Sequence, residues 1–74
     1  MSILDNLYNE LTRKAQIANK GITREIVEDW IGGAGANESQ QIAFMSMVLS
    51  DLLNGRVTPE QMAGNILQLA HRDN

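Results

Sequence analysis

Few side chains in this sequence could take part in catalysis or metal binding. Cysteine is absent and His71 is the one histidine, so a closed tetrahedral zinc site of cysteine and histidine ligands cannot form within one chain. No serine lies in the G-x-S-x-G setting that exposes a nucleophile. No acid and base pair is selected by the spacing of the carboxylates, which include Asp5, Glu10, Asp51 and Glu60. The sequence therefore predicts a protein that is not an enzyme and that uses neither a metal nor a cofactor.

Three acidic residues could form a binding surface. Glu25, Glu28 and Asp29 are three and four positions apart, a spacing at which like charges lie side by side on a helix and destabilise it slightly. A docking surface for a basic partner protein would account for that cost, and a solvated acidic face is the alternative. The formal net charge of -3 and the pI near 4.8 disfavour binding to nucleic acid or to an anionic membrane surface.

Two apolar residues form a second candidate surface. At the angular spacing of an α-helix, Phe44 lies at the edge of a broad apolar arc and Met47 lies outside it. A chain this small has too little core to bury every apolar side chain, and methionine adapts well to partner surfaces. These two side chains therefore either pack under another helix or form an interface, which a homo-oligomer would use.

The elements that position these residues are four predicted helices. Each begins at a capping residue and ends near a glycine or the end of the sequence, and the four caps are Ser2, Thr23, Asn37 and Thr58. The fourth has the clearest start, with Thr58 as the cap, Pro59 in the first turn and Gln61 at the third helical position. Apolar residues recur at helical spacing in each segment, and no strand pattern competes. The predicted helices cover approximately 3–19, 24–31, 38–54 and 59–72.

The predicted fold is all-α: a compact antiparallel bundle of four helices, the second short, because short connections favour antiparallel neighbours. A sequence of 74 residues is expected to be a single helical domain, 1–74. Without disulfides, its stability depends on close packing or oligomerisation. The sequence lacks a basic segment followed by an apolar run, and no apolar stretch approaches the roughly 20 residues that span a bilayer. We therefore expect a cytoplasmic protein.

A DNA-binding interpretation depends on Gly21, Ile22, Thr23, Val27, Trp30 and Gly33. Over about 13 residues this segment resembles the turn and second helix of repressor-type helix-turn-helix domains. That resemblance implies a second helix that enters the major groove of DNA. Two features depart from the family: Ala18 stands one position too close to Gly21, and the solvent face of the helix presents acidic residues.

The function expected from these patterns is that of a small acidic protein-binding module. Such a module would be an inhibitor, adaptor or accessory subunit that acts by stoichiometric protein–protein interaction, and its size and composition suit a bacterial or phage accessory protein. A DNA-binding, transcription-regulating domain and a structural subunit of a larger assembly are the alternatives. The candidate contact residues for the protein partner are Glu25, Glu28, Asp29, Phe44 and Met47.

Overall fold

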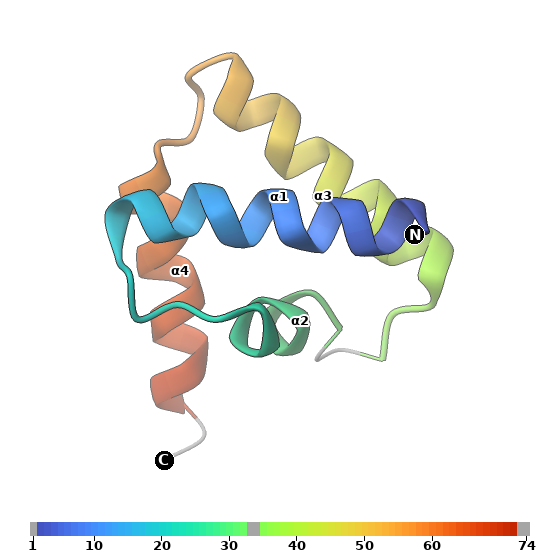
Figure 1. The fold of residues 1–74 in the computed structure, drawn as a ribbon, viewed down its shortest axis with the longest axis horizontal. Helices are drawn as coiled ribbons and strands as arrows, with labels where there is room; N and C mark the ends of the chain where they lie inside the picture. Colours follow the sequence, from blue (N-terminus) through green and yellow to red (C-terminus); the bar gives the residue numbers. More distant parts are fainter. Residues whose placement is uncertain (1, 33–34, 73–74) are drawn as a thin grey trace.

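The computed structural model describes residues 2–32 and 35–72, with side chains for 2–32 and 35–69. Within these ranges the backbone forms four α-helices and no strand, and none of the helices is long and apolar enough to cross a membrane. The all-α class and the short second helix are confirmed, and each predicted helix end lies within one residue of the observed end. The helices are α1 (Ile3–Ala18), α2 (Arg24–Gly32), α3 (Glu38–Leu53) and α4 (Pro59–Arg72) (Figure 1).

Hydrogen bonds at the helix ends follow the predicted capping chemistry. At the start of α3, the Gln40 backbone N–H donates to Asn37 Oδ1 at 2.9 Å, and the Asn37 N–H donates to Gln40 Oε1 at 3.0 Å. Thr58 and Gln61 make the same reciprocal pair at the start of α4. These capping boxes satisfy backbone donors that the first turn leaves unpaired. Gly55 follows the end of α3 with a φ of 75°, the conformation that favours glycine after a helix.

The core lies where α1 crosses the other helices. α1 packs against α2, α3 and α4, and α2 also packs against α3 and α4. Figure 1 shows α1 running across the middle of the molecule and α4 crossing it at a steep angle. Complete burial of an apolar side chain such as Leu11 or Met45 contributes about 1.5–3 kcal/mol. The buried apolar residues are Tyr8, Leu11, Ala15, Ile22, Val27, Ile31, Met45, Val48, Met62, Ala63 and Ile66.

One member of the core, Ile22, lies outside the helices, in the connection between α1 and α2. Its side chain is fully buried, and its carbonyl accepts a hydrogen bond of 2.8 Å from Gln16 Nε2. These contacts hold the connection against α1, so α2 begins at a defined place beside it. Helical periodicity could not assign this residue to the core because the residue belongs to no helix.

Helices α3 and α4 are joined by a short connection and then separate. Within the described ranges each packs mainly on α1 and α2, and little of α3 approaches α4. Figure 1 shows the two helices leaving their connection in different directions. Side chains of α2 therefore reach the region between α3 and α4, where the candidate site lies.

Candidate functional site

An aromatic pair marks the border between α2 and α3. The rings of Trp30 and Phe44 meet edge to face, with centroids 5.5 Å apart and an angle of 77° between the ring planes. Pairs with this geometry contribute about 0.5–1.5 kcal/mol beyond the burial of their surface. Trp30 is half-buried and Phe44 is 39% exposed. The pair is thus fixed in position while part of its aromatic surface stays open to solvent.

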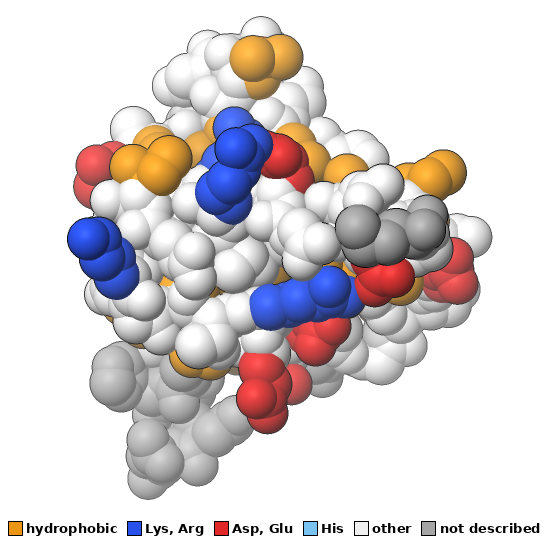
Figure 2. All heavy atoms as spheres, viewed as in Figure 1, with side chains coloured by type: hydrophobic (Ala, Val, Ile, Leu, Met, Phe, Trp, Pro, Cys, Tyr) orange, Lys and Arg blue, Asp and Glu red, His pale blue; other side chains and the backbone are white. Residues whose placement is uncertain are grey.

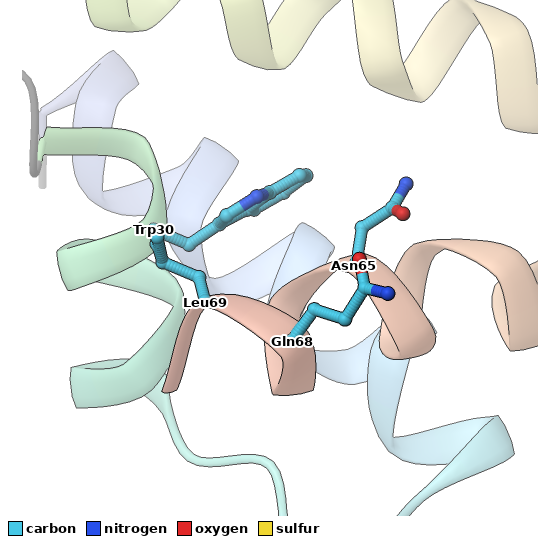
Figure 3. A pocket seen from close by; sticks show the side chains of 4 residues that line it. All are labelled: Trp30, Asn65, Gln68 and Leu69. Carbon is cyan, nitrogen blue, oxygen red and sulfur yellow. The ribbon is translucent and has the colours of Figure 1, made fainter. Parts of the chain in front are cut away.

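A hollow of about 490 Å³ lies between Trp30 and α4. Figure 3 shows the indole of Trp30 extending from α2 across α4, with the side chains of Asn65 and Gln68 projecting from α4 beside the hollow. Each amide offers both hydrogen-bond donors and an acceptor, and Leu69 adds an apolar side chain to the lining. We name this feature, together with the adjoining ring of Phe44, the Trp30 groove.

Met47 extends this apolar surface along α3. It follows Phe44 by three positions, a spacing that places two side chains on the same side of a helix, and it is 54% exposed. The two residues singled out on the predicted third helix therefore lie together, and one of them contacts the tryptophan that lines the groove. Neither is fully buried within the chain.

The other flank of α2 is joined to α1 by Arg24. Its Nη2 donates to Asp5 Oδ1 at 2.6 Å, its Nε to Glu28 Oε1 at 3.1 Å and its Nη1 to Asn9 Oδ1 at 3.1 Å. The guanidinium also lies over the ring of Tyr8, 5.5 Å from the ring centroid. We name these five residues the Arg24 cluster. Because the planar fork of arginine binds several acceptors at once, the charges of this flank are largely compensated within the chain.

The pKa values of two residues reflect the Arg24 cluster. The hydrogen bond from Arg24 lowers the pKa of the Asp5 carboxyl, and a second hydrogen bond from Ser2 acts in the same direction, because both favour the charged form. Burial raises the pKa of the Tyr8 phenol. The Tyr8 hydroxyl donates a hydrogen bond to Gln41 Oε1 on α3. The tyrosine therefore links α1 to α3 as a neutral hydrogen-bond donor at ordinary pH.

The three acidic residues predicted as one surface are placed in two different environments. Glu28 is held by Arg24 at 3.1 Å, whereas Glu25 and Asp29 are exposed. Figure 2 shows basic and acidic side chains next to one another on the face that carries α1 and α2, with apolar side chains scattered singly. The acidic surface that a partner could contact is therefore centred on Glu25 and Asp29.

Sequence reasoning did not select Asn65 or Gln68. Amides on the polar side of an amphipathic helix carry no distinctive signal, and only their three-residue spacing, which places both on one side of α4, could be read in advance. Leu69, on the same helix, is half-buried and lines the hollow. What makes these residues a site is the nearness of Trp30, a contact between distant parts of the sequence.

The groove offers aromatic and apolar surface together with amide donors and acceptors, a composition typical of the centres of protein interfaces. In the part of the chain that the structure describes, no three histidine, aspartate or glutamate side chains gather where a metal ion could be held, and the side chain of His71 lies outside that part. In the segment that resembles a helix-turn-helix, α2 exposes Glu25 and Asp29, which repel phosphates. Gly33 lies outside the described residues.

Comparison with known proteins finds no match among protein-family models, curated proteins or solved structures. The two flanks of α2 are the features from which a function can be inferred.

Proposed function

We propose that this chain is a small protein-binding module that works by stoichiometric association, as an inhibitor, adaptor or accessory subunit. The observation that carries the proposal is the Trp30 groove, in which a fixed aromatic pair borders an open hollow of about 490 Å³. Tryptophan, phenylalanine and methionine are enriched at the centres of protein interfaces, and charged residues are depleted there. The groove with the adjoining Met47 has this composition.

The energetics of the groove favour a polypeptide ligand. An apolar side chain inserted beside Trp30 would remove water from the indole and from the exposed part of Phe44, and each Å² of apolar surface so buried contributes about 25 cal/mol. Tryptophan in a desolvated pocket is a frequent centre of binding energy. Asn65 and Gln68 could hydrogen bond the backbone of the inserted segment, because each amide both donates and accepts.

A photo-reactive amino acid at position 47 tests the proposal in cell extract. We expect irradiation to attach the chain covalently to protein, another copy of this chain included, because Met47 lies one helical turn from Phe44 and is 54% exposed. The matched control places the same amino acid at Ile17, which is 73% exposed on α1. Circular dichroism establishes that both variants are folded. Adducts that form equally from both positions, or that do not form from position 47, would contradict the proposal.

Exposed acidic residues favour a second contact, with a basic protein. Glu25 and Asp29 are exposed on α2, and Asp29 directly precedes Trp30 in the sequence. Carboxylates at the rim of an apolar contact act mainly on the rate and specificity of association. Reversal of these two charges, compared with reversal at Glu28, tests this contact.

A further inference from the structure

The described lining of the Trp30 groove is uncharged, although the chain as a whole is acidic. Its members are aromatic, aliphatic or amide side chains, whereas the sequence carries nine acidic and six basic residues and a net charge of -3. Asp51, two helical turns after Phe44 on α3, is paired with Arg56 at 3.6 Å. The described lining of the groove therefore offers another acidic protein no carboxylate to oppose, and the exposed Asp29, which precedes Trp30, lies outside that lining.

Resting on the proposed function, we infer that the polypeptide that covers the Trp30 groove is a second copy of this chain. In a twofold dimer the same patch lies on both sides of the interface, so it must be complementary to itself. A patch of like charges fails this condition, whereas apolar groups and amides meet it, since an amide can donate to and accept from another amide. The side chains of Asn65, Gln68 and Leu69 beside Trp30 satisfy the condition.

A dimer of the usual size would need the contact to extend from the groove over neighbouring surface. A stable interface covers about 800 Å² on each partner, which is about one-sixth of the 4925 Å² of exposed surface. Phe44 and Met47 are 39% and 54% exposed and would supply the apolar centre of such a contact. Because the whole molecule is small, we expect an interface at the lower end of this range and a dissociation constant on the order of micromolar.

Sedimentation equilibrium over a concentration series measures this self-association directly. From about 5 to about 500 μM we expect the intact chain to pass from monomer to dimer. Met47→Ser should raise the dissociation constant at least about tenfold, as expected for one of the few side chains that carry most of the binding energy of an interface, and Ile17→Ser on α1 should leave it unchanged. Trp30, the one tryptophan, provides an independent readout, because its fluorescence emission should shift to shorter wavelength as the dimer forms.

A charged side chain at position 65 tests whether the Trp30 grooves of two copies face each other in the dimer. Asn65→Asp and Asn65→Lys should each weaken dimerisation, because like charges would meet across the twofold interface. An equimolar mixture of the two variants should dimerise again, because opposite charges then face one another. A contact elsewhere on the molecule would show neither the loss nor the recovery.

Two results would overturn the inference. If the wild-type chain stays monomeric over the whole concentration series, a second copy does not cover the Trp30 groove. A dimer that is weakened by Ile17→Ser but not by Met47→Ser or by charge at Asn65 places self-association on another face. In either case, adducts to a different protein from the photo-reactive position 47 would leave the proposed function standing with another partner. Absence of those adducts as well would remove both proposals.

Discussion

The two flanks of α2 use different chemistry, although they belong to one short helix. On one flank Arg24 is hydrogen bonded to Asp5, Asn9 and Glu28, so its donors are used within the chain. On the other flank Trp30 contacts Phe44 but borders an open hollow lined by amides. The first flank attaches α2 to α1, and the second presents surface that nothing in the described chain covers. We infer that the first serves stability and the second serves binding.

This contrast also shows that a charged residue on α2 is not by itself a candidate for partner binding. Charged residues were the most conspicuous binding candidates in the sequence, but the structure shows that Glu28 is bound to Arg24 within the chain. Exposed ion pairs of this kind contribute little stability each, and the pair of Arg24 with Asp5 is the one that joins α2 to α1. The orientation of α2 in turn fixes the direction in which Trp30 projects toward α4 (Figure 3).

The largest expected effect comes from removing the residue that anchors the start of α2. Ile22→Ala should lower the free energy of unfolding by about 2–5 kcal/mol, because the fully buried side chain leaves a cavity. Urea denaturation followed by circular dichroism measures this change. The matched control, Ile22→Val, should cost about 0.5–1.5 kcal/mol. Equal, small losses for both variants would show that this connection is not part of the core.

The next largest loss of stability is expected from removing the guanidinium that holds the Arg24 cluster together. Arg24→Ala should lower the urea midpoint by less than Ile22→Ala does, because it removes partly exposed hydrogen bonds and the contact with the Tyr8 ring. Arg24→Lys should recover only part of the loss, since an ammonium cannot reproduce the planar fork. Self-association through the groove should remain in both variants, and its loss would show that the two flanks of α2 are not independent.

The features that sequence predicted well are those determined by near neighbours. The caps at Asn37 and Thr58 were visible because each acts on a residue three positions away, and the helix ranges followed from them. The position of Met47 outside the apolar arc also followed from its own helix, but the sequence left open whether the side chain packs under another helix, and in the structure it is 54% exposed. These features need no knowledge of how the helices pack.

Features that depend on distant residues could not be predicted. The ion pair between Arg24 and Asp5 joins two helices, and the Trp30 groove requires α2 to lie beside α4. By its angular position Leu53 belongs to the apolar arc of α3, yet it is 88% exposed because α3 ends there and no described helix covers it. Periodicity gives the face of a helix but not the crossing angles that decide which part of that face is covered.

Acid should weaken the Arg24 cluster. Because the folded-state pKa of Asp5 is lowered, its contribution to stability is present above the unfolded-state pKa of about 4 and is lost as pH falls through the lower, folded-state pKa. Thermal melts from pH 6 down to about pH 2.5 should therefore show a falling melting temperature below about pH 4. Asp5→Asn should melt lower at neutral pH and show a shallower fall. Parallel curves for the two proteins would contradict this assignment.

The smallest expected effect on stability comes from charge reversal on the exposed side of α2. Glu25→Lys and Asp29→Lys should each change the free energy of unfolding by less than about 0.5 kcal/mol, as is usual for exposed positions. Glu28→Lys makes the same charge change on the same helix but places an ammonium beside Arg24, so it should be the destabilising member of the set. Urea denaturation of the three variants ranks them directly.

The same three variants separate binding from folding. If a basic protein contacts the exposed acids, Glu25→Lys and Asp29→Lys should weaken its binding while the fold and the dimer are kept, and added salt should weaken binding to the wild type. Unchanged binding in both variants would restrict the contact to the Trp30 groove. A stability loss at Glu25 or Asp29 as large as that at Glu28 would instead show that all three carboxylates serve the fold, and the two flanks of α2 would no longer differ in role.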